Sequence, residues 1–377
     1  MATQTQTLQQ PVHDDGGSMA PDTACDEPAP SAPGGAGSGA FTKSKDGQEV
    51  DKVYGTRPKT TWHLKPRKEL TLWEGIAAID TCPPDIYRKR HEHEKRGPMP
   101  TQPIWKENLF IISTGSFGPL IHYTWNKLFP DHLMHWAPAL VVYHLTFIVF
   151  AISLINRLHA KMISFGVFDE QNRGRDMVDD KHVNHLGRSI FIYTVLRVVQ
   201  PFIAQWRGQM VNPFDGLSVW SPLKLAVWEI ALDYWFYLYH RSSHEFDSLW
   251  WVHRQHHATK HPTPILSILA DDVQECLEIF ICPFLATVCA PTLTFAEFHY
   301  AIVYTLYVEA LGHSGIRAVW QHPVLGYFLR PFGMELAVED HDLHHRFGRS
   351  EQTRIWDRVF GTIGDRIETP ATGTRFF

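Results

Sequence analysis

Long apolar stretches without charged side chains begin after residue 108, and they predict helices that cross a membrane. Residues 109–126 and 137–156 contain no Asp, Glu, Lys or Arg. The second stretch matches the roughly 20 residues that a helix needs to cross a hydrocarbon core. Residues 189–206 and 222–239 are also apolar but contain charged residues, which are costly in a membrane unless they face a protein interior.

A fifth apolar region, residues 264–311, is broken by Cys-Ala-Pro-Thr at 289–292 and predicts a helical hairpin. Such a hairpin enters and leaves on one side, and the four earlier segments return the chain to the side where it began. The N-terminal region, the charged loop 157–188 and the tail 312–377 then share one face. The positive-inside rule makes this face cytosolic. A soluble helical protein with buried apolar helices is the alternative.

The N-terminal part differs in composition from the rest of the chain. Residues 1–50 are rich in Pro, Gly, Ala, Ser, Asp and Thr and predict disorder, because they bury too little apolar surface to offset the entropy of ordering. Residues 51–107 are charged and aromatic and predict a cytosolic segment. A membrane-surface anchor with Trp62 and Trp73 at the lipid headgroups is the alternative. Residues 108–377 are predicted to form the membrane-embedded domain.

Net charge and cysteine content narrow the function and compartment. The 377 residues carry a formal charge of −5 at pH 7, so no overall positive field predicts nucleic acid binding. The five cysteines form no Cys-x-x-Cys motif, and three lie in the apolar region, as is typical of reduced, buried thiols. The chain therefore favours a reducing environment.

Histidine is the main compositional excess, and nine of the 23 histidines fall into four groups. One group has two histidines four apart, two groups have the spacing i, i+3, i+4, and one is a single residue. On a helix, each spacing places the rings on one face, so each group is predicted to present its rings in one direction. The nine are His240 and His244; His253, His256 and His257; His313; and His341, His344 and His345.

Imidazoles with few carboxylates among them suit Fe, Cu or Zn rather than Mg or Ca. Nine ligands exceed the coordination positions of one ion, so the pattern predicts two metal ions. The chain has neither the His-Glu-x-x-His of zinc hydrolases nor the Glu-x-x-His of carboxylate di-iron proteins. The predicted fold is therefore all-α: a multi-pass membrane helical bundle with a cytosolic, histidine-rich di-metal cap.

The histidine motifs resemble those of the membrane fatty acid hydroxylase/sterol desaturase superfamily. The first motif also contains Asp233 and Tyr237 at the family's positions, and the resemblance covers roughly residues 135–365. The matching stretches are DYWFYLYHRSSH (233–244), WVHRQHHATKHP (251–262), LGHSG (311–315) and DHDLHH (340–345).

This resemblance implies a non-haem di-iron site held by the histidines at 240–261, 313 and 341–345. Two Fe ions would use O₂ and two electrons to oxidise an unactivated C–H bond. The electrons would come from NAD(P)H through cytochrome b5 and its reductase, or an equivalent donor. The expected location is the endoplasmic reticulum membrane, with the histidines facing the cytosol and with membrane lipid and a hydrophobic small molecule as partners.

Two departures from the family pattern affect the predicted site. The family's His-Pro-x-Glu element is replaced by ADDVQE at 270–275, so Asp271 or Asp272 is a weak ligand candidate. No His-Pro-Gly-Gly of a fused cytochrome b5 occurs, so an external electron donor is expected. The residues predicted to support the ligands are Asp233, Tyr237, Glu309, Asp340 and Asp342.

The sequence thus predicts an O₂-dependent oxidoreductase that hydroxylates or desaturates a hydrophobic substrate. That substrate is a sterol, a lipid or a terpenoid- or polyketide-like specialised metabolite, which would place the protein in lipid or sterol biosynthesis. The alternatives are a membrane metal-binding or metal-transport protein and an inactive family member that acts as a scaffold.

Overall fold

The computed structural model describes residues 60–80, 97–168, 176, 178–348 and 354–369. All of them belong to one unit of the chain, Ala36–Phe377. The predicted disordered segment 1–50 lies outside the described residues, as does much of the predicted cytosolic segment 51–107.

Helices dominate the described part of the chain, in which the only strand-like pairings are two isolated bridges. This confirms the all-α prediction. The α-helices are α2 (Leu72–Asp80), α4 (Ile104–Gly115), α5 (Phe117–Leu128), α6 (Trp136–Phe165), α7 (Val183–Gln205), α8 (Ser221–Glu245), α9 (Trp250–His253), α10 (Asp272–Cys276), α11 (Cys282–Cys289), α12 (Phe295–Gly312), α13 (Gly326–Leu329), α14 (Val338–Phe347) and α15 (Arg354–Phe360). Short 3₁₀ turns are η2 (Trp62–Leu64), η3 (Arg67–Glu69), η5 (His256–Ala258), η6 (Pro264–Ile268) and η8 (Arg330–Phe332), and η7 (Leu277–Ile281) is a π-helical turn.

Two helices, α6 and α7, are long and apolar enough to cross a membrane by length and composition. Helix α6 has 30 residues and extends the predicted stretch 137–156 at its C-terminal end. The predicted stretch 109–126 instead forms two helices, α4 and α5, which part at Ser116. Pro119 lacks the amide that would bond to the carbonyl of Gly115, and the ring of His299 takes this carbonyl at 2.8 Å.

The apolar region 264–311 breaks where the sequence predicts, since α11 ends at Cys289 and α12 begins at Phe295. Thr294 and Glu297 form a capping box at the start of α12, which explains the sharp restart. The first arm is less regular than predicted, because η6, α10 and η7 precede α11.

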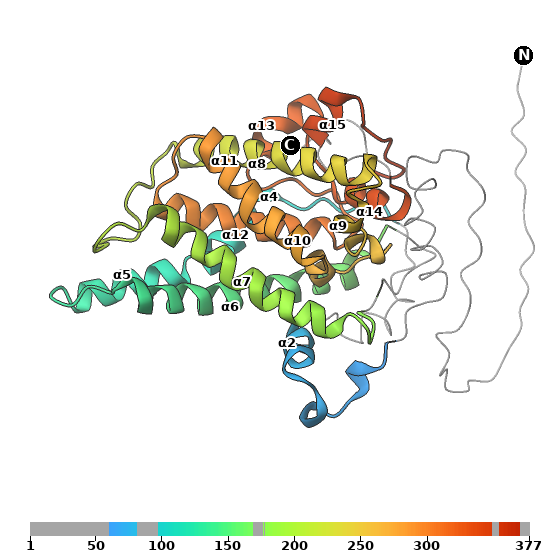
Figure 1. Cartoon of the computed structure of the whole chain (residues 1–377). Coiled ribbons are helices and arrows are strands. Elements are labelled where there is room, and N and C mark those ends of the chain that lie inside the picture. Colours follow the sequence, from blue (N-terminus) through green and yellow to red (C-terminus); the bar gives the residue numbers. More distant parts are fainter. Residues whose placement is uncertain (1–59, 81–96, 169–175, 177, 349–353, 370–377) are drawn as a thin grey trace, which may run out of the picture. The chain divides into compact units, whose positions relative to one another are not determined.

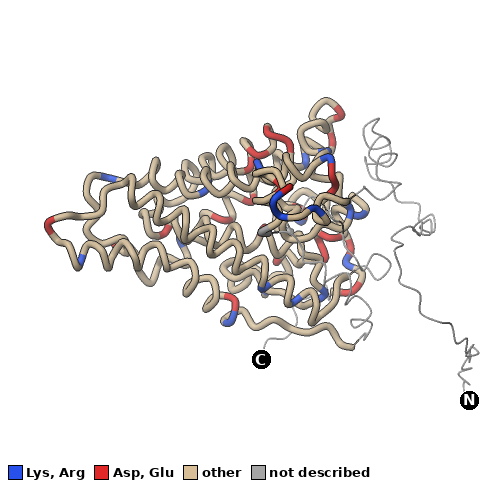
Figure 2. Tube along the Cα trace, turned by 90° about the horizontal axis from the view of Figure 1, so that it is seen from below, with Lys and Arg blue, Asp and Glu red and all other residues tan. Residues whose placement is uncertain are grey.

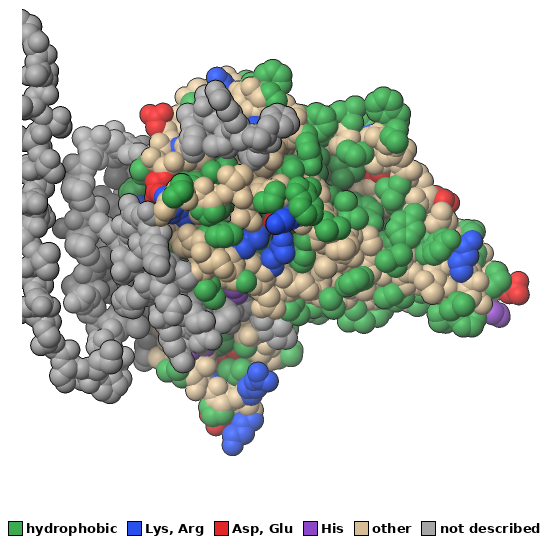
Figure 3. Space-filling model, turned by 180° about the vertical axis from the view of Figure 1, so that it is seen from behind, with side chains coloured by type: hydrophobic (Ala, Val, Ile, Leu, Met, Phe, Trp, Pro, Cys, Tyr) green, Lys and Arg blue, Asp and Glu red, His purple; other side chains and the backbone are tan. Residues whose placement is uncertain are grey.

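Helix α12 contacts α4, α6, α7, α8 and α14 and so lies at the centre of the described helices (Figure 1). Charged residues gather at the end that holds α9 and α14 and are sparse toward the opposite end (Figure 2). There, hydrophobic side chains cover much of the surface (Figure 3). Exposed apolar residues of α5 and α6 include Leu120, Ile121, Trp125, Val141, Leu145 and Val149.

The two tryptophans considered as a membrane anchor pack against protein. Trp62 is only 2% exposed, and its indole donates to the carbonyl of Val178 at 2.8 Å. Trp73 lies on α2 and packs against Phe191 of α7. Trp62 is therefore not available to insert at lipid headgroups, and that alternative is wrong for this residue.

Gly187 allows the close approach of α2 and α7. A Cβ at this position would lie 2.1 Å from the backbone carbonyl oxygen of Trp73. We expect Gly187→Ala to destabilise the protein by about 1–3 kcal/mol, because backbone atoms must move to accept the methyl group. Thermal unfolding in detergent tests this, with Gly75→Ala as the control, since a Cβ at Gly75 has open space around it. Equal unfolding temperatures for the two variants would contradict the expectation.

Candidate metal centre

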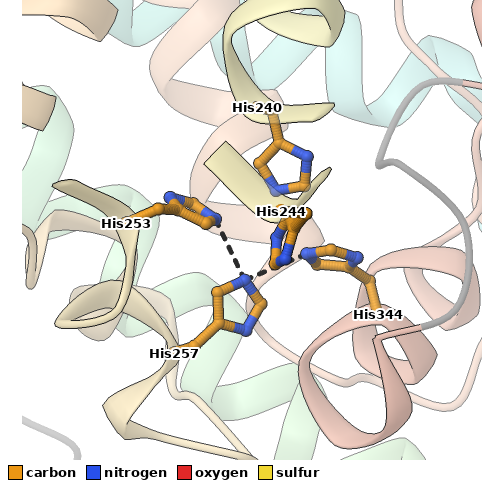
Figure 4. Close-up of side chains that lie close together, drawn as sticks. All are labelled: His240, His244, His253, His257 and His344. Carbon is orange, nitrogen blue, oxygen red and sulfur yellow. Dashed lines mark hydrogen bonds between the residues drawn. The ribbon is translucent and has the colours of Figure 1, made fainter. Parts of the chain in front are cut away.

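The nine histidines of the four sequence groups come together in the fold, at the end of α12. Helix α8 carries His240 and His244, the segment from α9 to η5 carries the next three, His313 caps α12, and α14 carries the last three. They form two groups in which the possible ligand atoms lie within 4.8 Å of one another. Figure 4 shows the rings of the first group converging from three segments. Group one is His240, His244, His253, His257 and His344; group two is His256, His313, His341 and His345.

The two His-x-x-His-His motifs do not present their rings in one direction, contrary to the prediction. His253 and His257 join group one, whereas His256 between them joins group two. In α14, His341 and His345 join group two and His344 joins group one. In α14, at 100° per residue, positions i+3 and i+4 lie about 60° and 40° on opposite sides of position i, so this motif can supply both groups at once. The first motif begins at the end of α9 with His253 and continues into the 3₁₀ turn η5 with His256 and His257, so its rings are not arranged by one α-helix.

Hydrogen bonds at Nδ1 fix the orientation of three rings. His313 Nδ1 donates to the backbone carbonyl of Glu309 at 2.7 Å, and His345 Nδ1 donates to that of Thr259 at 3.1 Å. His253 Nδ1 lies 3.1 Å from the side-chain oxygen of Gln274. A neutral imidazole that carries its proton on Nδ1 has its lone pair on Nε2. The Nε2 atoms of these three rings are therefore set to accept a metal ion.

The distances between ring nitrogens fit shared metal ions. Nε2 of His257 lies 3.0 Å from Nε2 of both His253 and His344. In group two, the Nε2 atoms of His313 and His256 are 3.0 Å apart, and those of His345 and His341 are 3.1 Å apart. With metal–nitrogen bonds of about 2.1 Å, two nitrogens at right angles around one ion are separated by about 3 Å. Both groups thus have the donor type and spacing of a metal site.

Burial keeps these imidazoles neutral. Eight of the nine side chains are at most 4% exposed, and His244 is half-buried. Removal from water lowers the pKa well below its ordinary value, and neighbouring imidazoles lower it further. A neutral ring is the form that binds metal. Outside α8, the groups with this pKa shift are His253, His256, His257, His341 and His345.

The carboxylates predicted to support the ligands have other contacts. Glu309 accepts from Tyr193 and pairs with Arg197, and it reaches His313 through its backbone carbonyl. Asp340 pairs with Arg366 and Asp342 with Arg346. Tyr237 accepts from Arg241 and contacts Thr362, and Asp233 lines a cavity described below. Their support of the metal ligands stays a prediction.

Asp271 and Asp272, the weak ligand candidates, lie outside both histidine groups. Asp271 caps α10 by accepting from the amide of Val273, and Asp272 pairs with Arg188 at 2.6 Å. Asp272 belongs to a separate acidic cluster with His185 and Glu275, in which the nitrogens of His185 face the carbonyl of Ala270 and the guanidinium of Arg188. The residue of 270–275 that reaches the histidines is Gln274.

Sequence reasoning missed three residues near the first histidine group: Gln274, Tyr239 and Glu278. Tyr239 places its hydroxyl 3.3 Å from Nδ1 of His253, and Gln274 donates to Glu278 at 2.9 Å. Gln274 and Glu278 lie among other polar residues in ADDVQECLE (270–278), so the sequence pattern did not distinguish them. Together they extend from the first histidine group toward the cavity.

A cavity of about 140 Å³ adjoins the second histidine group. Apolar side chains of α8 and α12, among them Leu232, Phe236 and Val308, form part of its wall. Its polar lining includes His256, His313, His341, His322, Glu229, Asp233, Glu278 and Glu309.

We expect Gln274→Leu to weaken metal binding at group one by about 10–100-fold, because it removes the acceptor that orients His253. Iron retention against a competing chelator measures this. Gln274→Glu keeps an acceptor oxygen and should retain the metal, and Val273→Ala changes a partly exposed neighbour as the control. If Gln274→Leu holds iron as tightly as the unchanged protein, Gln274 does not position a ligand.

Several helical segments bring together two sets of buried, neutral imidazoles. This arrangement identifies the protein as a histidine-rich candidate metalloprotein. The family model described as fatty acid hydroxylase matches residues 225–362, which contain all nine histidines. Over an aligned stretch of 174 residues, the chain is 40% identical to "Fatty acid hydroxylase vlmA" of Lecanicillium sp. This stretch covers 43% of this chain and 48% of the relative. The chain thus spans about half the length of that relative. No solved structure matches the chain.

Residues 225–362 thus match the fatty acid hydroxylase family, and this match confirms the resemblance drawn from the histidine motifs.

Proposed function

We propose that this protein is a membrane-bound, O₂-dependent hydroxylase that oxidises a C–H bond of a hydrophobic substrate at two iron ions. The observation that carries the proposal is the pair of histidine groups, with inward Nε2 atoms about 3 Å apart, beside a partly apolar cavity. Group one would hold one ion and group two the other.

Bound iron would supply the chemistry of O₂ reduction, in which one oxygen atom enters the C–H bond as a hydroxyl and the other leaves as water with two electrons and two protons. The residues of this chain have three tasks. The histidines hold the ions, Gln274 and the carbonyls of Thr259 and Glu309 hold the rings, and the surrounding apolar side chains exclude water.

The membrane arrangement is part of the proposal. Helices α6 and α7, the exposed apolar side chains of α5 and α6, and the gathering of charges at the histidine end support a chain embedded in lipid with that end in water. We propose that α4 and α5 together, α8 and the hairpin of 264–311 also lie in the membrane, that the histidines face the cytosol, and that the membrane is the endoplasmic reticulum.

NAD(P)H is the proposed electron source, acting through cytochrome b5 and its reductase or an equivalent carrier. Among sterols, lipids and specialised metabolites, the name of the Lecanicillium relative favours an acyl lipid, and it favours hydroxylation over desaturation.

Isotope incorporation tests the proposed reaction. Iron-loaded protein in detergent is given ¹⁸O₂, a chemical reductant and a panel of acyl lipids and sterols, and products are analysed by mass spectrometry. One ¹⁸O atom per hydroxylated product is expected. Protein that contains two irons per chain but consumes no O₂ with any lipid, with or without a b5-type electron carrier, would contradict the proposal and favour a metal-binding or scaffold role.

A further inference from the structure

The cavity beside group two extends along α8 and α12, away from the histidines. On α8 its lining reaches back to Glu229, which precedes His240 by about three turns, or about 16 Å along the helix axis. On α12 it reaches Thr305, which precedes His313 by about 12 Å. Glu229 therefore marks the end of the cavity remote from the histidines.

Glu229 is a buried polar group whose side-chain oxygens have no hydrogen-bond partner among the described residues. Its side chain is 6% exposed, and both oxygens are inaccessible. The nearest ring is that of His322, whose Nδ1 lies 4.0 Å from Glu229 Oε2. That nitrogen already accepts from the amides of Val324 and Leu325, so it carries no proton to donate to Glu229.

Two other carboxylates on the cavity wall have partners. Glu309 accepts from Tyr193 and pairs with Arg197, and Glu278 accepts from Gln274. Nearly all buried polar side chains in proteins have a hydrogen-bond partner, and a buried group that lacks one indicates a missing component. Glu229 lines the cavity, so that component is a molecule in the cavity, which a rotation of the Glu229 side chain would bring within hydrogen-bond distance.

We infer that Glu229 is a substrate-positioning residue that accepts a hydrogen bond from a hydroxyl or amine at the end of the substrate remote from the oxidised carbon. The inference rests on the proposed function for the position of that carbon. Asp233 lines the same cavity one turn further along α8, so a second acidic group adds to the preference for a donor.

Direct binding of three probes that share one alkyl chain tests the inference without turnover. The probes are hexadecanol, hexadecylamine and hexadecyl methyl ether, and full-length protein is compared with Glu229→Gln, Glu229→Leu and the control Val227→Ala. Val227 lies on the same helix and is partly exposed. The unchanged protein should bind the alcohol, the amine or both at least about tenfold more tightly than the ether.

Glu229→Leu should reduce donor binding to the level of the ether, while Val227→Ala should leave the ratio unchanged. Glu229→Gln keeps an acceptor and should retain alcohol binding but lose any preference for the amine. If the unchanged protein prefers the amine, the natural substrate carries an ammonium group at this end. If it binds the amine and the alcohol equally, the site recognises a hydrogen-bond donor of either kind.

Equal binding of all three probes by the unchanged protein, or an unchanged donor-to-ether ratio in Glu229→Leu with normal metal content, would overturn the inference. Metal content and unfolding temperature of each variant report on folding. If donor binding depends on Glu229 but no lipid is hydroxylated, the proposed function fails and the binding role of Glu229 stands.

Discussion

His344→Ala and His256→Ala are each expected to reduce turnover to background and to lower bound iron from two ions per chain to one. His344 belongs to group one and His256 to group two, so each variant removes a ligand from a different proposed ion. Both side chains are at most 4% exposed, and water replaces a buried imidazole poorly. Iron per chain and product formation are measured on the same preparations.

His132→Ala is the control, because His132 is exposed and belongs to neither group. It should keep full activity and both ions. Full activity in His256→Ala or His344→Ala would remove that histidine from the ligand set. Loss of both ions from each single variant would instead show that the two groups bind metal as one cooperative unit.

Removal of metal is expected to lower the unfolding temperature by about 10 °C or more. An ion that binds only the folded protein stabilises it by about 4 kcal/mol when its concentration is a thousandfold above Kd, and two sites contribute separately. In the metal-free protein the imidazoles remain closely packed with no ion between them. Burial opposes their protonation when the pH falls. Thermal unfolding with and without a strong chelator measures the difference.

The double variant His256→Ala/His344→Ala provides the comparison for this second prediction. Chelator should shift its unfolding temperature by much less than that of the unchanged protein, because both proposed sites are already incomplete. An equal shift in both proteins would mean that the stabilising metal binds elsewhere.

Helix periodicity and motif spacing predicted much of this fold and site. The apolar stretches of α6 and α7, the break at 289–292 and the helical character of the described residues agree with the sequence analysis. All nine predicted histidines lie in the two groups.

Tertiary contacts determine what the sequence did not predict. The division of each His-x-x-His-His motif between two groups depends on its tertiary neighbours, because the histidines of α8 complete group one and His313 at the end of α12 completes group two. Gln274 was missed because it meets His253 only through the packing of α10 against α9, and no motif spacing in the sequence connects these two residues. The split of 109–126 into two helices is different, because it has a local cause. Pro119 lacks a backbone amide, and this could be read from the sequence.

Metal content per chain, measured by plasma mass spectrometry on the full-length protein purified in detergent and loaded with ferrous iron, tests the central claim most directly. Two histidine groups with inward Nε2 atoms predict two irons per chain, one lost in His344→Ala and one lost in His256→Ala. A single ion per chain, or iron content that both substitutions leave unchanged, would contradict the two-iron site on which the proposed hydroxylase rests.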